Sequence, residues 1–126
     1  MKSIRDITKL MGVTESALRY YNEKGVLQPT VRNKTGRRQW LYSEADIKRL
    51  KLILLYRKLG ISVDDIALLL EDESRRKDIL KARLSSLETE KKELAEQAFI
   101  IRILELMEDD ERLINLLEER ENGIYK

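Results

Sequence analysis

The stretch from about Glu73 to Met107 constrains the fold of this 126-residue chain most, because it contains neither Gly nor Pro. Its mostly apolar positions recur at alternating steps of four and three residues, which is a heptad pattern. At 1.5 Å per residue, the predicted helix is roughly 50 Å long. The members of its seam are Leu80, Leu84, Leu87, Lys91, Leu94, Ala98 and Ile101.

No other segment of the chain is long enough to cover this seam, so a second copy is expected to do so. The sequence therefore predicts a homodimer, and a long helix that folds back on its own domain is the alternative. A parallel pair in register would place Lys91 against its own copy, with like charges in a partly desolvated seam. An antiparallel pair avoids that contact.

A helix-turn-helix is predicted near the N-terminus. Ser3 and Asp6 have the spacing of a capping pair at the start of the first helix. Gly12 can supply the left-handed residue that ends this helix, and Thr14 can cap the next one. The apolar residues at helical spacing in the first helix are Ile4, Ile7, Leu10 and Met11.

The second helix has two different sides. One side is fit to pack on the first helix and consists of Ala17, Leu18 and Tyr21; the other consists of Ser16, Arg19, Tyr20 and Glu23. The Arg19 guanidinium suits phosphate or guanine edges, and the Tyr20 phenol suits a phosphate oxygen. This outward side predicts a contact with DNA. A helical hairpin with a solvated charged face has the same spacing and is the alternative.

The string from Ala17 to Tyr21, followed by Gly25-Val26-Leu27 and then by Pro29, closely resembles the recognition helix of the MerR family of bacterial transcription regulators. The resemblance covers about residues 1–70. It implies a winged helix-turn-helix, a second helix pair and a long dimerisation helix that pairs antiparallel. It also implies a dimer that binds double-stranded DNA at a pseudo-palindromic promoter with an overlong spacer, and that twists this DNA so that RNA polymerase can engage.

Residues 30–42 have no helical period and are predicted to form two short extended segments around a turn at residues 33–36. This is the candidate wing, where cationic side chains can straddle the DNA backbone or enter the minor groove. Trp40 and Tyr42 follow in strand alternation and can face the same side. With the second helix, the wing gives a predicted DNA-binding set of Thr14, Ser16, Arg19, Tyr20, Tyr21, Lys24, Arg32, Lys34, Arg37, Arg38, Trp40 and Tyr42.

The wing departs from the pattern of the family that it resembles. Members commonly carry an aromatic residue after the Gly of the turn, whereas this chain has Arg37, and the stretch before Ser43 is longer here. Arg38 matches the wing Arg of the family. Either Trp40 or Tyr42 can take the place of the family's Tyr, and Trp40 can instead fill the domain core.

Two further helices are predicted between the wing and the long helix. Ser43 and Asp46 form a cap-like pair that opens a helix running to Leu59 and stopping at Gly60. A shorter helix begins after Ser62, which again has a carboxylate three residues on. The predicted stripe of the longer helix is Ile47, Leu50, Ile53, Leu54 and Arg57.

The predicted fold is mostly α, in three parts. Residues 1–72 form the DNA-binding domain, a winged helix-turn-helix with a small β wing. Residues 73–107 form the dimerisation helix, an antiparallel coiled coil, and residues 108–126 form a short C-terminal helix and a tail. The buried side of that last helix is predicted to be Leu113, Ile114, Leu116 and Leu117.

Charge is divided unequally along the chain. Residues 1–60 contain 14 Lys or Arg and 5 Asp or Glu, a net +9, whereas residues 61–126 contain 11 and 18, a net −7. The N-terminal half should be attracted to a polyanion and the C-terminal half repelled by it, which orients the molecule on DNA.

The composition also bounds the chemistry. The chain has no Cys and no His, which removes thiolate and imidazole ligands, thiol redox switching and the commonest general base. With no nucleophile–base pair and no phosphate-binding Gly loop, the sequence predicts that the protein is not an enzyme and uses no cofactor or metal. The longest apolar runs have five residues, too few to span a bilayer, so a cytoplasmic protein is expected.

The regulating signal is left open by the sequence. Phe99, Ile103 and Met107 can line a small pocket for an organic effector, although such a stripe is also typical of core. About twenty residues follow the long helix, which is too few for a separate ligand domain. A protein partner and a constitutive binder without any effector are the other interpretations.

The leading prediction is therefore a sequence-specific, dimeric DNA-binding transcription regulator. An architectural or chromosome-organising protein, which uses the same domain without controlling a promoter, is the alternative.

Overall fold

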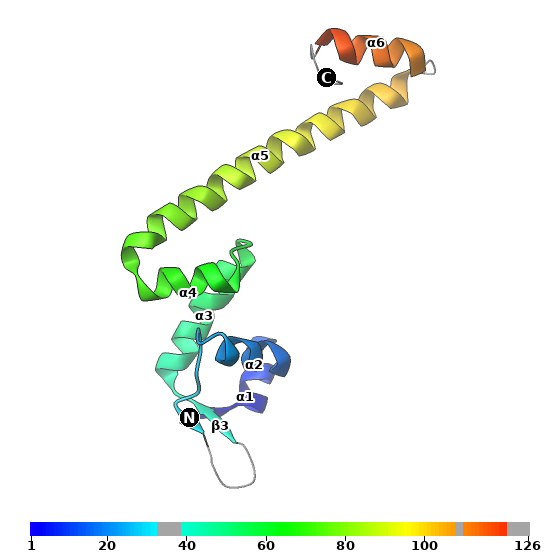
Figure 1. Cartoon of the computed structure of the whole chain (residues 1–126). Helices are drawn as coiled ribbons and strands as arrows, with labels where there is room; N and C mark the ends of the chain where they lie inside the picture. The colour runs from blue at the N-terminus through cyan, green and yellow to red at the C-terminus, as the bar shows by residue number, and fades with distance from the viewer. Residues whose placement is uncertain (33–38, 108–109, 121–126) are drawn as a thin grey trace. The chain divides into compact units, whose positions relative to one another are not determined.

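The computed structural model describes residues 1–32, 39–107 and 110–120. It is mostly helical with one small sheet, as predicted, and it falls into two compact units, Met1–Arg83 and Leu84–Lys126. None of the described helices has the length and apolar character needed to cross a membrane. The described elements are β1 (Lys2–Ser3), α1 (Ile4–Met11), α2 (Glu15–Glu23), β2 (Val31–Arg32), β3 (Trp40–Tyr42), α3 (Glu44–Lys58), α4 (Val63–Glu71), α5 (Glu73–Leu106) and α6 (Asp110–Arg120) (Figure 1).

Helices α1 and α2 form the predicted helix-turn-helix. A capping box starts α1: Ser3 Oγ accepts from the Asp6 N–H at 3.2 Å, and Asp6 Oδ2 accepts from the Ser3 N–H at 3.3 Å. Gly12 ends α1 with φ of 68°, a left-handed conformation that Gly adopts without strain. Thr14 Oγ1 then accepts from the Ala17 N–H at 3.1 Å and starts α2.

The buried side of α1 differs in one place from the predicted stripe. Ile7 is fully buried, and Ile4 and Met11 pack beside it against the core. Leu10 is largely exposed, so its expected place on this side is wrong. Helix α1 has only eight residues, and Ile7 is the one that it buries completely.

The sheet has three antiparallel strands in the order β1-β3-β2. Strands β2 and β3 are the two predicted segments of the wing, whereas β1 was not predicted, because a two-residue strand has no alternation to detect. Lys2 lies opposite Tyr42 and Arg32 lies opposite Trp40. The central strand β3 is thereby covered on both edges.

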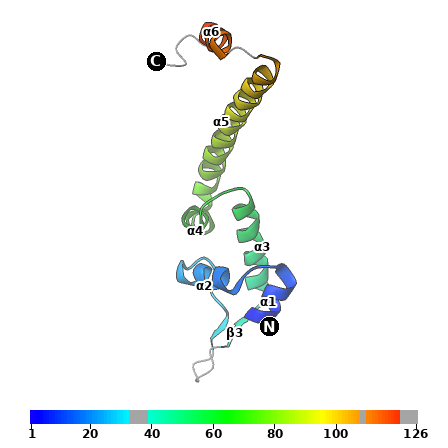
Figure 2. The same ribbon diagram turned by 90° about the vertical axis from the view of Figure 1, so that its right-hand side faces the viewer.

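Helices α3 and α4 complete the core of the first unit. Both begin at a capping Ser, Ser43 and Ser62, and Gly60 turns the chain between them with φ of 79°. Figure 2 shows α1 and α2 gathered around β3 and one end of α3. The buried side of α3 consists of Leu50, Ile53 and Tyr56. Arg57, predicted on that side, is exposed, and its Nη1 donates to the Ile61 carbonyl at 2.9 Å.

The first turns of α5 belong to the first unit. Ile79 and Leu80 pack against its core, and Arg83 Nε donates to the Leu59 carbonyl at 2.7 Å. The first compact unit therefore includes the start of α5 as far as Arg83. Leu80, predicted as part of the dimer seam, is used within its own chain, because the helix starts against the domain that precedes it.

The second unit contains the rest of α5 and α6. Leu84, Leu94 and Ile101 are 57%, 64% and 56% exposed; Leu87 and Lys91 are exposed as well, and Ala98 is half-buried. In α6, Leu113 and Leu117 are buried. Ile114 and Leu116 were predicted to be buried with them but are exposed. Residues four apart, such as Leu113 and Leu117, lie on the same side of a helix, and this side of α6 is the buried one.

Candidate nucleic-acid interface

Helix α2 presents a polar side at the surface of the first unit. Leu18 and Tyr21 are buried on the opposite side, and this burial fixes the rotation of the helix about its axis. Its exposed residues include Ser16, Arg19, Tyr20, Glu23 and Lys24. Thr14 is also exposed, but its hydroxyl oxygen accepts the capping hydrogen bond.

Arg19 has two neighbours on this side. Its Nη2 and Nε donate to Glu15 Oε1 at 2.8 and 3.3 Å, and Glu15 lies one helical turn earlier. Its Cζ lies 5.1 Å from the centroid of the Trp40 ring. Because both side chains of the ion pair are about half-exposed, the pair adds little stability, and Arg19 can exchange it for a phosphate or a guanine edge.

Arg32 approaches the same ring from the sheet. It lies directly across from Trp40 in the β2–β3 register, and its Cζ is 5.5 Å from the ring centroid. Arg32 Nη2 also donates to Asn22 Oδ1, so the strand is joined to α2. The wing strand and the recognition helix thus place two guanidinium groups around one indole.

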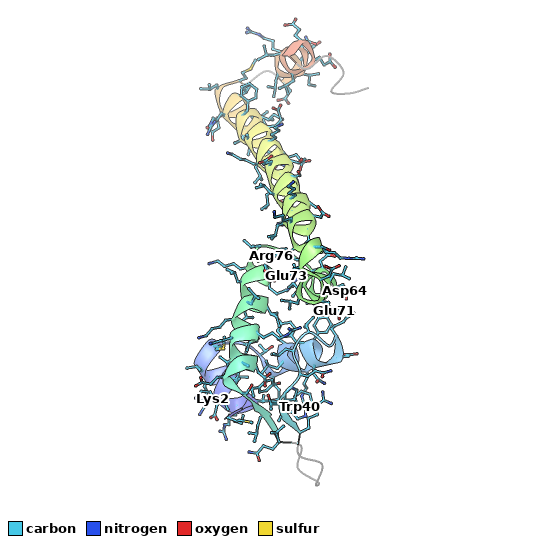
Figure 3. The ribbon with its side chains drawn as sticks, turned by 90° about the vertical axis from the view of Figure 1, so that its left-hand side faces the viewer. Lys2, Trp40, Asp64, Glu71, Glu73 and Arg76 are labelled. Carbon is cyan, nitrogen blue, oxygen red and sulfur yellow. The ribbon has the colours of Figure 1, made fainter. Side chains whose placement is uncertain are left out.

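Lys24 lies at the C-terminal end of α2. Its Nζ is 5.8 Å from the centroid of the Tyr20 ring and 3.4 Å from Asp64 Oδ1 on α4. Figure 3 labels Asp64 on this helix. Since Asp64 is mostly exposed, the contact is weak, and Lys24 remains available to a phosphate.

A hydrogen-bond cluster fixes the base of the wing. Asp46 Oδ2 accepts from the N–H of Thr30 at 3.1 Å and from the N–H of Ser43 at 2.9 Å, and it also accepts from the Thr30 hydroxyl. Burial alone would raise the pKa of Asp46, but the hydrogen bonds from Thr30 and Ser43 outweigh it and lower the pKa below 3.8. Arg49 Nε donates to the Val26 carbonyl at 2.6 Å and ties α3 to the end of the recognition helix.

A hollow of about 550 Å³ opens beside Arg19, where the first turns of α1 and α2 meet β3. The N-termini of both helices and two guanidinium groups, those of Arg5 and Arg19, favour an anion there, whereas the Glu15 carboxylate opposes one. The lining residues are Ser3, Ile4, Arg5, Thr8, Thr14, Glu15, Arg19, Gln39 and Trp40.

Three aromatic residues of the predicted DNA-binding set lie in the core instead. Tyr21 and Trp40 are 6% and 9% exposed, and Tyr42 is fully buried. Burial, followed by the nearby Asp46 carboxylate, raises the pKa of Tyr42, and its hydroxyl has no hydrogen-bond partner among the described residues. Tyr21 and Tyr42 therefore do not offer a side chain to DNA, and Trp40 fills the core, which was the alternative for it.

The other predicted wing cations lie outside the described residues: these are Lys34, Arg37 and Arg38. Arg32 is the wing cation that the structure places beside α2.

Sequence reasoning missed Glu15 and Asn22, the two residues of α2 that hold the guanidinium groups. The contact of Glu15 with Arg19 could have been predicted, because the two residues are four apart on a predicted helix. The contact of Asn22 with Arg32 could not, because only the tertiary structure brings these two residues together.

The residues proposed for an effector pocket, Phe99, Ile103 and Met107, are half-buried. A pocket of about 230 Å³ includes Met107 together with Arg112, Asn115, Leu116 and Glu119. This volume lies below the usual range for small-molecule sites. In the described ranges, no three acidic residues come together as metal ligands. The effector stays a prediction.

Comparison with known proteins places the chain in a family. A family model described as "MerR HTH family regulatory protein" matches residues 2–73. This match covers more than half of the chain, so the chain belongs to the MerR family of DNA-binding transcription regulators. The relatives TipA and ZntR are both named as transcription regulators with a helix-turn-helix.

Among the relatives, the transcriptional activator TipA of Streptomyces coelicolor is 36% identical over 94 residues, which are 68% of this chain and 36% of TipA. The regulator ZntR of Escherichia coli is 39% identical over 70 residues, 56% of this chain and 48% of ZntR. The chain thus matches about a third to a half of the length of these relatives.

Solved structures share the fold. MtaN, the N-terminal part of the multidrug transporter activator of Bacillus subtilis, has a TM-score of 0.71 at 25% identity, over 85% of this chain and 100% of MtaN. EcmrR, solved in a complex with DNA, has a TM-score of 0.74 at 22% identity, over 88% of this chain and 41% of EcmrR. At that identity, the second likeness concerns the fold alone.

Proposed function

We propose that this chain acts as a homodimer on a pseudo-palindromic promoter, with α2 in the major groove and the wing on the adjoining DNA backbone. The dimer distorts the DNA between its half-sites, and RNA polymerase engages the distorted promoter. The observation that carries this proposal is the joint placement of Arg19 on α2 and Arg32 on β2 around Trp40. Helix and wing thereby form one cationic surface, suited to a polyanion.

The dimer is argued from the second unit. Leu84, Leu94 and Ile101 recur at heptad positions and are each more than half exposed. A row of this kind on one helix is expected to be covered by a partner helix. The exposed Lys91 in the same row disfavours a parallel pair in register, so the proposed pairing is antiparallel.

The relatives support a role at promoters. TipA and the protein from which MtaN is taken are named as activators. By this likeness, the present chain is proposed to regulate transcription and not merely to organise DNA.

Spacer length provides the test of this function. Hydroxyl-radical footprinting on the DNA upstream of its own reading frame should show two protected half-sites around a promoter spacer. Shortening that spacer by about two base pairs outside the half-site contacts should abolish regulated transcription, because the distortion then no longer corrects the spacing. Binding to isolated half-sites should be unchanged. Transcription that is indifferent to both the protein and the spacer would favour an architectural DNA-binding protein.

A further inference from the structure

Trp40 is the single tryptophan of the chain, and it lies at the junction of the recognition helix and the wing. Its ring is almost entirely buried, with Arg19 approaching from α2 and Arg32 from the neighbouring strand. Figure 3 labels Trp40 among the side chains of the first unit. No sequence pattern predicted that these three residues would meet.

The two guanidinium groups repel one another, so their shared position needs a physical cause. Each has one polar anchor on α2: Arg19 donates to Glu15, and Arg32 donates to Asn22. Each also lies within about 6 Å of the ring centroid, the distance over which an aromatic quadrupole attracts a cation. The indole is the group that both share.

We propose that Trp40 is a positioning residue for DNA binding, whose indole holds Arg19 and Arg32 in a fixed relation before DNA arrives. This inference rests on the proposed function, in which both arginines meet DNA. Long cationic side chains lose rotamer freedom when they bind, and a preorganised pair loses less. Trp40 itself is too buried to contact the DNA.

The electronic character of the ring distinguishes this role from simple core packing. A cation–π contact depends on the electron density of the ring, whereas packing depends on its shape. Fluorine atoms withdraw electron density and change the shape very little. At the strength usual for such contacts, losing each of them should weaken binding about two- to fivefold.

The experiment uses the full chain with its single tryptophan replaced by mono-, di- and trifluorotryptophan. Affinity for the footprinted promoter DNA is measured by fluorescence anisotropy, and folding is checked by circular dichroism. Affinity should fall stepwise with each added fluorine while the folded spectrum stays the same. In a protein that also carries Arg19→Gln and Arg32→Gln, measured at low salt, the same series should be flat.

Two outcomes would overturn the inference. One is a flat or rising affinity along the fluorinated series when Arg19→Ala and Arg32→Ala each weaken binding, because the arginines would then meet DNA without help from the ring. The other is equal affinity for Trp40→Phe and Trp40→Leu, since only the first keeps an aromatic face. If Arg19→Ala and Arg32→Ala bind as tightly as the wild-type protein, the proposed function fails instead.

Discussion

The first unit and the second unit of this protein use apolar residues in opposite ways. In the first unit, Ile7, Leu18 and Leu50 come from three different helices and are fully buried in one core. In the second unit, Leu84, Leu94 and Ile101 lie along a single helix and are mostly exposed. The helices of the first unit have eight to fifteen residues and bury one side against one another, whereas α5, with 34 residues, has no fully buried residue along its length. The exposed row of the second unit is the surface on which we propose that a second copy packs.

The largest effect should come from a charge in the exposed row of the second unit. Leu94→Asp would place a carboxylate where the partner helix is proposed to pack, so the dimer should dissociate. Affinity for a full two-half-site promoter should fall by roughly a hundredfold or more, because the second half-site no longer binds intramolecularly. Sedimentation measures the assembly, and a gel-shift titration measures the affinity.

The matched control is Lys92→Asp, which introduces the same carboxylate at an exposed position outside the heptad row. It should stay dimeric. A wild-type protein that sediments as a monomer at micromolar concentration would remove the basis of the comparison between the two units.

The next effect in size belongs to the surface of the first unit. Arg19→Ala should weaken binding by about 1–3 kcal/mol if Arg19 reads a base edge, and should relax the preference at one base pair of each half-site. If Arg19 binds only phosphate, the loss will be uniform across sequences and the salt dependence will decrease. Lys92→Ala removes one positive charge from the second unit and should have little effect. Equal losses in the two variants would contradict the division of labour between the units.

A smaller effect is expected inside the first unit, at the base of the wing. Asp46→Asn should lower the free energy of unfolding by about 1–2 kcal/mol at pH 7, because it removes charge-assisted hydrogen bonds from Thr30 and Ser43. The folded-state pKa of Asp46 is depressed, so its contribution is fully present above its ordinary value of 3.8. That contribution disappears as the pH falls through the lower, folded-state value.

Urea unfolding at a series of pH values measures this contribution of Asp46 to the free energy of unfolding. The curves of the wild-type and Asp46→Asn proteins should run parallel near neutral pH and converge below about pH 4. A constant gap down to the lowest pH would show that the carboxylate charge has no part in holding the wing base.

The smallest effect concerns the start of the recognition helix. Thr14→Ala should destabilise the protein by about 1 kcal/mol, because the Ala17 N–H loses its capping acceptor. Thr14→Ser keeps that acceptor and should restore stability, as measured by thermal unfolding. If Thr14 contacts DNA through its methyl group as well, Thr14→Ser will be stable but will bind more weakly. Loss of stability in Thr14→Ser would instead exclude the hydroxyl as the cap.

Much of the first unit follows from local patterns. The capping residues Ser3, Thr14, Ser43 and Ser62 all start helices as predicted, because a cap is satisfied by backbone groups within three residues. Burial of individual side chains was less predictable. Ile114 and Leu116 have the same apolar character as Leu113 and Leu117, yet only the latter two are buried.

In the candidate site, too, the burial of individual side chains could not be predicted from the sequence. Alternation in the strand correctly put Trp40 and Tyr42 on one side, but it did not say that this side faces the core. A strand pattern gives two faces, and only the packing of α2 and α3 decides which face is covered. For this reason the strand pattern could not show that Tyr42 is buried in the core and not turned toward DNA.

The sequence by itself determined the helix boundaries, the turns at Gly12 and Gly60, the division of charge and the family to which the chain belongs, because these depend on residues close together in the chain. Only the tertiary structure decided that Arg19 and Arg32 meet at Trp40, and that Leu80 and Arg83 of the long helix pack on the first unit. The contacts of Trp40 with Arg32 and Arg19 and that of Arg83 with Leu59 join residues 8, 21 and 24 positions apart, so they form only after the core has fixed the elements that carry them.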